Sequence, residues 1–270
     1  LSETGTSRTI RPEINLPTLM PDLIGSALAL PGLWWLVGAI IAAGIVRGFS
    51  GFGSAMIIMP AASSVLEPFA ALTFLVVVEF WGPLPNLRSA WHAGQRWDAL
   101  RILVGAALAL PVGLWALSMM APAVFGWTVS IAVLVLLVLL VTGWRYAGTV
   151  GPRTLFGVGA LGGLLGGIAG VPGPPVIILY LASAKPIAII RANFLLYLLG
   201  IDLMMLAIFG VLGLLDSVAV FVGLLLVPVY MAANILGARF FDPDAEHVFR
   251  AVAYLVIAAS AILGLPVWKS

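Results

Sequence analysis

The residues of this sequence that could do chemistry are a few charged side chains inside long apolar stretches. Arg47 lies beside a glycine-rich run, while Glu79 and Asp202 lie within the apolar segments 69–87 and 187–211. A charge in an apolar environment is costly, so such a residue pairs with another charge, binds a substrate or ion, or carries a proton. Arg47 is therefore a candidate for binding an anion, with a structural pair to Glu79 as the alternative. Glu79 and Asp202 are candidates for a coupling role, with pairing to a nearby arginine as the alternative.

Two glycine-rich runs, residues 47–53 and 166–174, interrupt the apolar stretches at matching places in the two halves. The flanking apolar pieces have about 9–15 residues, fewer than the roughly 20 that a membrane helix needs. Broken membrane helices point to a substrate site, because half-helix N-termini present free N–H groups to an anion. The alternative is close helix packing through small residues. Besides Arg47, the predicted substrate-binding residues of the two runs are Phe49, Ser50, Gly51, Phe52 and Gly53, and Gly170, Val171, Pro172 and Gly173.

Arg191 and Asn193 follow the second run and complete the predicted substrate-binding set. Arg191 has a simpler interpretation as a positive residue at the membrane boundary. We expect no cofactor and no metal site, because cysteine is absent and the two histidines, His92 and His247, are far apart in the sequence. Nucleotide-binding loops, catalytic triads and basic clusters for nucleic acid are also missing from the sequence. The pattern therefore predicts neither an enzyme nor a nucleic-acid-binding protein.

The composition places these residues in a membrane protein. The chain is 62% hydrophobic and 9% charged, whereas a soluble domain carries about 25% charged residues. Runs such as 131–141 are apolar on every face, unlike the alternating strands of a transmembrane barrel. We expect an all-α polytopic membrane protein whose partners are the lipid bilayer and a small anionic substrate, and the sequence leaves a homo-oligomer open.

The apolar segments form two repeats of one pattern, in which a glycine-broken helical hairpin precedes three transmembrane helices. The first repeat is predicted at 33–46 and 55–66, followed by 69–87, 99–119 and 126–143, and the second at 154–168 and 174–182, followed by 187–211, 217–237 and 248–265. Residues 1–32 are predicted to be a tail, in which the sequence leaves a short interfacial helix open. The predicted boundaries of the two repeats are 33–150 and 151–270, and both belong to one integrated transport domain.

Recurring residues support a duplication. Gly48 and Gly51 recur 119 residues later as glycines, and Pro68 and Asp98 recur 118 residues later as proline and aspartate. If each broken segment folds back as a hairpin, the three further crossings invert the second repeat relative to the first. Whether the hairpins are re-entrant or cross fully is left open, because both arrangements leave the two ends of the broken segment on the same side of the membrane.

The positive residues predict the orientation of these inverted repeats. Nine of them fall on one side, namely Arg88, Arg96, Arg101, Arg145, Arg153, Lys185, Arg191, Arg239 and Arg250. Positive residues concentrate in cytoplasmic loops. These loops are therefore expected in the cytoplasm and the protein in the inner membrane.

The glycine-rich motifs resemble those of the sulfite exporter TauE/SafE family. The residues that carry the resemblance are Gly48-Phe49-Ser50-Gly51-Phe52-Gly53 followed by Pro60, then Gly163 to Pro175, and then Arg191-x-Asn193-Phe194. The resemblance covers residues 33–265. Ser50 and Ser54 stand where the family often has glycine, and their hydroxyls could either donate to an anion or narrow the site.

The resemblance implies a secondary transporter for a small sulfur-containing anion such as an organosulfonate, sulfoacetate or sulfite. We expect alternating access driven by a proton or cation gradient through Glu79 or Asp202. The sulfonate group is expected between the hairpin tips, with any organic part against Phe49, Phe52 and Trp81. The alternatives are a transporter of another small anion, such as a carboxylate, or an anion channel formed by the paired half-helices.

Overall fold

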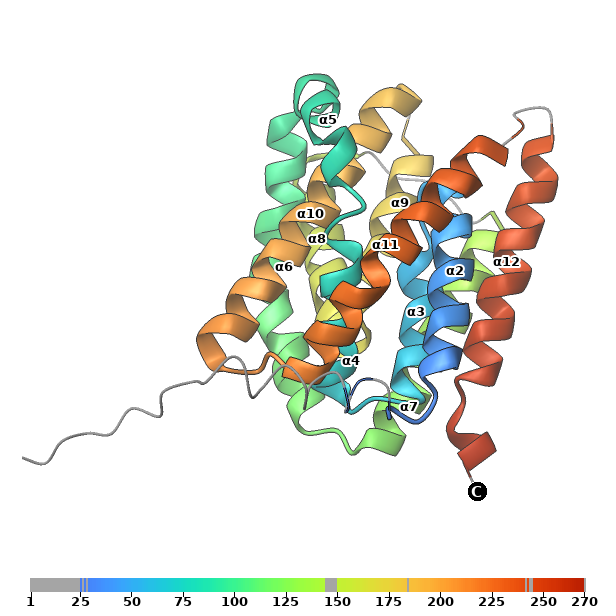
Figure 1. The fold of residues 1–270 in the computed structure, drawn as a ribbon. Helices are drawn as coiled ribbons and strands as arrows, with labels where there is room; N and C mark the ends of the chain where they lie inside the picture. Colours follow the sequence, from blue (N-terminus) through green and yellow to red (C-terminus); the bar gives the residue numbers. More distant parts are fainter. Residues whose placement is uncertain are drawn as a thin grey trace, which may run out of the picture.

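The computed structural model describes residues 29–143, 150–183, 185–240 and 245–269, together with residues 25, 27 and 242. The regular elements in these residues are all helices, as predicted. In chain order they are α2 (Leu33–Ser50), α3 (Ser54–Ser63), α4 (Pro68–Glu79), η1 (Leu84–Asn86), α5 (Leu87–Ala93), α6 (Arg96–Ser118), α7 (Pro122–Val141), α8 (Pro152–Ala169), α9 (Gly173–Leu181), α10 (Ile187–Leu212), α11 (Ser217–Phe240), α12 (Glu246–Leu263) and η3 (Pro266–Lys269) (Figure 1). Most of the tail with its expected interfacial helix, and Arg145, lie outside the described residues.

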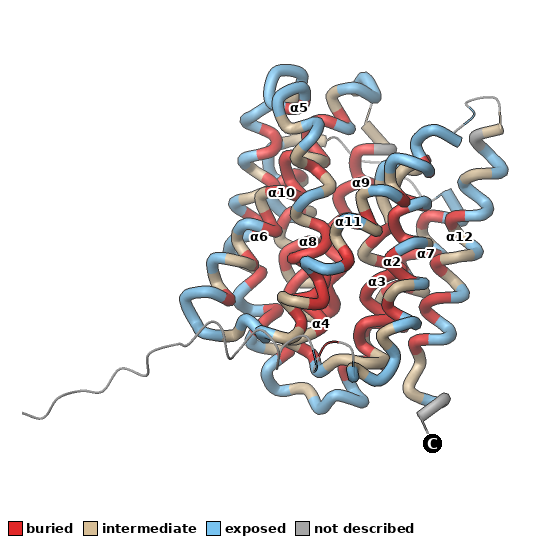
Figure 2. The backbone as a smooth tube through the Cα atoms, in the orientation of Figure 1, coloured by how far each residue is buried: buried red, intermediate tan, exposed pale blue. Residues whose placement is uncertain are grey.

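The long helices have the length and composition of membrane spans. Within the described residues, α2, α6, α7, α10 and α11 are long and apolar enough to cross a bilayer, and the bent pair of α4 with residues 84–93 adds a sixth. Only 33–44% of each of the five spans is buried inside the protein. Figure 2 shows the buried positions gathered in the middle of the bundle, on α3, α8 and α9, and exposed positions along the outer helices. Lipid is the solvent that suits these exposed apolar faces.

The first hairpin breaks later than the sequence analysis predicted. α2 continues to Ser50 instead of ending at residue 46, which places Arg47 in its last helical turn. The helix stops where Gly51 adopts a left-handed conformation with φ 79° and donates its N–H to the Arg47 carbonyl at 2.8 Å. Gly53 also has a positive φ, of 90°, and α3 begins directly after it. Glycine adopts this conformation without the steric cost that other residues meet, so the break is confined to residues 51–53.

The second hairpin follows the prediction to within two residues. α8 ends at Ala169, Gly170 takes a left-handed conformation with φ 67°, and α9 begins at Gly173. The starts of α8 and α9 lie 119 residues after those of α2 and α3. The observed helix boundaries thus repeat with the offset found in the sequence.

The predicted crossing at 69–87 is not one continuous helix. α4 ends at Glu79, and the chain bends by 40° before residues 84–93 continue. Gly82 lies at this bend, where a Cβ atom would be only 3.1 Å from the Cζ atom of Arg47. The Arg47 guanidinium therefore packs directly against the backbone of the bend. Pro83 follows, and its missing N–H weakens helix continuation.

Many of the glycines serve close packing between the two repeats. α11 packs along α2, and in the matching arrangement α6 packs along α8. A Cβ at Gly48 would lie 2.3 Å from the Asn234 carbonyl oxygen of α11, and one at Gly159 would lie 2.0 Å from the Ile102 carbonyl oxygen of α6. Each hairpin is thus held by a helix of the other repeat through contacts that admit no side chain.

Matching helices run in opposite directions in Figure 1. α6 descends in the view and α11 ascends, while α4 ascends and α10 descends. The starts of α6, α10 and α12 lie at the upper end together with α5, and these segments carry many of the positive residues used for the topology prediction. This arrangement supports the predicted inverted repeats, which stay a prediction here.

Candidate anion-binding site between the hairpin tips

A small cavity lies between the two hairpin breaks. The lining residues come from both tips and from the helices that follow them: Arg47, Phe52, Gly53, Ser54, Ala55, Met56, Glu79, Pro172, Gly173, Pro174, Phe194 and Leu198. Its volume is about 20 Å³, and a cavity of roughly 10–15 Å³ is the least that holds one water molecule. The cavity is therefore closed around a water-sized space.

Arg47 and Glu79 form a buried ion pair at this cavity. The Nη1 atom of Arg47 lies 3.5 Å from Oε2 of Glu79 and donates a hydrogen bond of 3.2 Å to the Ser54 hydroxyl. Arg47 is 9% exposed and Glu79 is 6% exposed. Glu79 Oε1 has no hydrogen-bond partner in the described residues. The pair thus leaves one carboxylate oxygen unsatisfied in a closed site, where unpaired polar atoms are costly.

Two further polar side chains approach the Arg47 guanidinium. Tyr230 of α11 and Asp202 of α10 both interact with it electrostatically, and Tyr230 also faces Ser54. The Tyr230 hydroxyl has no partner with hydrogen-bond geometry in the described residues. Arg47 therefore contacts Glu79 and Ser54 and lies within electrostatic range of Asp202 and Tyr230.

The two hairpins offer different numbers of N–H donors to the cavity. The first N–H groups of a helix have no acceptor inside it and favour negative charge. At the start of α3 these groups belong to Ser54 and its neighbours, which line the cavity. At the start of α9, Pro174 and Pro175 have no N–H, so Gly173 is the donor that remains. The start of α3, next to Arg47, is the more electropositive side.

Tyr197 holds the second tip in place. Its hydroxyl donates a hydrogen bond of 3.1 Å to the Pro172 carbonyl, and both groups are buried. A Cβ at Gly162 would lie 2.2 Å from this hydroxyl, so glycine is needed there. Tyr197 stands 118 residues after Glu79, as the repeat comparison indicated. The matching positions of the two repeats thus carry a charged cavity residue in one and a positioning residue in the other.

A family model described as sulfite exporter TauE/SafE matches residues 36–263, which include both hairpins. The chain belongs to the sulfite exporter TauE/SafE family. TauE/SafE proteins are membrane transporters, and together with the candidate spans this makes the chain a multi-pass membrane transporter. Comparison with curated proteins and with solved structures found no match.

In this TauE/SafE protein, six of the fourteen predicted site residues line the cavity. Arg47, Phe52, Gly53, Pro172, Gly173 and the coupling candidate Glu79 do so. Gly51, Gly170 and Val171 shape the breaks but lie outside the lining.

Phe49 and Ser50 do not line the cavity, because their side chains make other contacts. The Phe49 ring packs on Phe249 of α12 with centroids 5.3 Å apart. The Ser50 hydroxyl lies 2.6 Å from the Val46 carbonyl and 2.7 Å from the Phe52 carbonyl, so it serves the end of α2.

The predicted residues that follow the second tip, on α10, do not line the cavity. Arg191 is exposed at the start of α10, which agrees with its simpler interpretation as a boundary residue. Asn193 is fully buried, but its Oδ1 accepts the Gln95 N–H at 2.7 Å and its side chain does not line the cavity. Asp202 is buried on α10 within electrostatic range of Arg47 and Glu79, also outside the lining.

Other cavity residues were not predicted as site residues. They are Ser54, Ala55, Met56, Pro174, Phe194 and Leu198. Ser54 and Pro174 had a usable signal, because both lie at the start of the second arm of a hairpin. Leu198 lies one turn after Phe194 on α10, and no local pattern distinguishes it from other apolar helix positions.

Proposed function

We propose that this TauE/SafE protein is a secondary transporter that moves a small sulfonate or sulfite-like anion across the inner membrane. The observation that supports it most is the Arg47–Glu79 pair beside the start of α3, between the two hairpin tips. A guanidinium with adjacent helix N–H groups and a serine hydroxyl suits an anion with several oxygens. Phe52 and Phe194 give an apolar wall for an organic group.

Charge balance suggests how transport is coupled. Before the anion binds, the negative partner of Arg47 is Glu79. An anion that takes this place leaves Glu79 as an uncompensated carboxylate in a buried site, and such a charge is strongly disfavoured unless it takes up a proton. We therefore propose that Glu79 is protonated when the anion is bound, so that proton and anion move in the same direction.

The closed cavity favours alternating access over a continuous pore. A sulfonate is larger than the single water that about 20 Å³ accommodates, so the tips must separate to admit it. In our proposal each hairpin moves against the helix of the other repeat that holds it, with the basic loops in the cytoplasm.

Transport assays in proteoliposomes test this function. Sulfite, sulfoacetate, methanesulfonate and benzenesulfonate, with acetate and benzoate as carboxylate controls, are offered with and without a pH gradient. We expect saturable, gradient-driven movement of at least one sulfur anion. Transport of the carboxylates alone would contradict the sulfur assignment, and non-saturable flux would favour the channel.

Two variants test the coupling proposal. Arg47→Lys retains the charge but loses the planar donor geometry, so we expect a raised KM and residual transport. Glu79→Gln mimics the protonated carboxyl, so we expect anion exchange to continue while acceleration by the pH gradient disappears. Full gradient-driven transport in Glu79→Gln would rule out Glu79 as the coupling residue.

A further inference from the structure

A second cavity lies at the end of the bundle where α6 and α8 begin, and its volume is about 430 Å³. Its walls come from both repeats. The first repeat contributes Gln95, Asp98 and Arg101 from the start of α6, and the second contributes Lys185 from the link between α9 and α10 and the first residues of α8. This cavity has room for a small organic anion and several waters, in contrast to the closed cavity between the tips.

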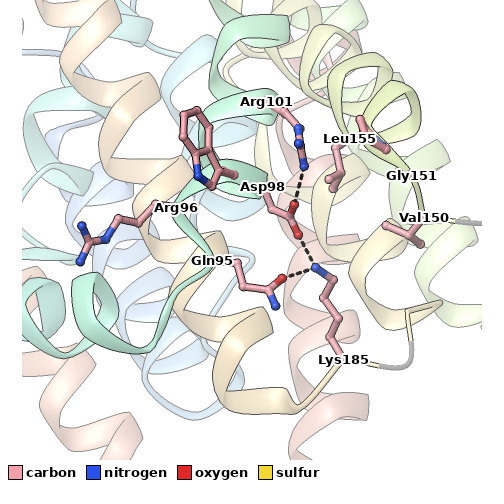
Figure 3. Close-up of a pocket in the computed structure, with 10 residues that line it drawn as sticks. Gln95, Arg96, Asp98, Arg101, Val150, Gly151, Leu155 and Lys185 are labelled. Carbon is pink, nitrogen blue, oxygen red and sulfur yellow. Dashed lines mark hydrogen bonds and ion pairs between the residues drawn. The ribbon is translucent and has the colours of Figure 1, made fainter.

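One carboxylate in this cavity holds two cations. Arg101 Nη1 lies 3.1 Å from Oδ1 of Asp98, while the Lys185 ammonium donates to Oδ2 of Asp98 and to the Gln95 side-chain oxygen. Figure 3 shows Arg101 and Lys185 approaching Asp98 from opposite sides, with Arg96 directed away. The Asp98 side chain is 12% exposed, against 42% for Arg101 and 23% for Lys185. The cations are therefore more accessible than the carboxylate that joins them.

Buried polar groups lie next to this cavity, around Gln95. Asn193 accepts the Gln95 N–H, and Tyr180 lies next to Asn193 and within electrostatic range of Asp98. Neither the Asn193 Nδ2 nor the Tyr180 hydroxyl has a hydrogen-bond partner in the described residues. Phe194, the residue after Asn193, lines the central cavity. Two buried polar atoms without a hydrogen-bond partner in the described residues thus lie near Gln95, although a buried polar group normally has a partner.

We propose that Lys185 and Arg101 form an anion-docking station, at which the transported sulfonate takes the place of the Asp98 carboxylate on its way to or from the central site. The anion class rests on the function proposed above. The chemistry is the same as that proposed for Arg47, where a carboxylate pairs with the cation until an anion replaces the carboxylate. Because Lys185 belongs to one repeat and Asp98 to the other, docking also loosens a contact between the repeats beside the second hairpin.

The matching positions at the other end of the repeat lack the station. The residues 118 positions from Lys185 and Asp98 are Glu67 and Asp216, so two carboxylates stand where the station has a cation and a carboxylate. Asp216 is already engaged, because its Oδ1 accepts the Ala219 N–H at 2.7 Å. The station is therefore particular to one end of the protein, which gives the two faces different affinities for an arriving anion.

The lysine content of the chain allows a direct test that needs no transport. The two lysines of the sequence are Lys185 and Lys269. The full-length protein in detergent is treated with an amine-acylating reagent, and mass spectrometry follows the modification of each lysine. Methanesulfonate is compared with chloride at equal ionic strength. We expect methanesulfonate to slow modification of Lys185 and not of Lys269, because an anion bound at Lys185 covers its amine from the reagent. Equal Lys185 rates in the two salts would overturn the proposal.

Asp98→Asn distinguishes docking from a purely structural ion pair. Without the competing carboxylate, half-protection of Lys185 should occur at a methanesulfonate concentration about fivefold lower. A change in affinity of about fivefold corresponds to the energy of a partly exposed ion pair. A structural pair predicts no protection by methanesulfonate in either protein, and that result would overturn the station.

Protection of Lys185 must also persist in Arg47→Lys or Arg47→Met. Its loss in both variants would show that protection comes from the central site, which would also overturn the proposal. Protection in a protein that transports no sulfur anion would refute the proposed function and leave the station in place.

Discussion

The buried Arg47–Glu79 pair makes a quantitative prediction for Arg47→Met. The two side chains are 9% and 7% exposed and their charged atoms lie 3.5 Å apart. Removing one partner of a buried pair costs about 3–5 kcal/mol, because the other charge stays buried without compensation. For a protein of this size each kcal/mol lowers Tm by about 2–4 °C, so Tm at pH 8 should fall by roughly 10 °C.

The double variant Arg47→Met/Glu79→Gln supplies the internal control. It leaves neither charge of the pair, so its Tm should lie above that of Arg47→Met at pH 8. Glu79→Gln alone should lose less than Arg47→Met, because Asp202 remains near the guanidinium. Thermal unfolding in detergent at pH 8, followed by intrinsic tryptophan fluorescence, measures all four proteins.

Two results would refute this reasoning. One is an Arg47→Met protein as stable as the wild type at pH 8, which would mean that water reaches the pair in the detergent-solubilised protein. The other is additivity of the two single losses in the double variant, since residues that form a pair show a coupling energy.

Three further variants address positioning, packing and the predicted site. Tyr197→Phe removes the hydrogen bond to Pro172 and should cost about 1 kcal/mol of stability and raise the KM for the transported anion, measured in proteoliposomes; an unchanged KM would exclude Tyr197 as a positioning residue for the tip. Gly159→Ala should lower Tm, because its Cβ would meet a carbonyl of α6 at 2.0 Å and overpacking costs about 1–3 kcal/mol. Its control, Gly157→Ala in the same helix, has nothing within 4 Å of the new Cβ and should stabilise by up to about 1 kcal/mol; equal effects would contradict the packing described. Arg191→Gln should leave KM within twofold of wild type, and a tenfold rise would return the exposed Arg191 to the substrate site.

Local properties of the sequence were sufficient for the membrane class and the two hairpins. The shortage of charge and the long apolar runs predict helices in a bilayer, because only a helix satisfies its own backbone there. The glycine-rich runs that contain the breaks also follow from the sequence, and within them Gly51, Gly53 and Gly170 adopt left-handed conformations that other residues avoid. The sequence could not show that α2 continues to Ser50. Gly48 lies inside this helix because α11 packs too closely there for a side chain, and that contact is seen only in the structure.

Tertiary structure decided which polar residues meet. Nothing in the sequence spacing distinguishes Ser50, whose hydroxyl bonds to the backbone at the end of α2, from Ser54, whose hydroxyl accepts a hydrogen bond from Arg47. Pairing of Arg47 with Glu79 was one of several alternatives, and it required the bend after α4 that brings Gly82 against the guanidinium. The separate positions of Arg191 at the surface and Asn193 inside follow from which face of α10 meets the first repeat. Periodicity and composition describe one segment at a time, whereas these contacts join residues that are far apart in the chain.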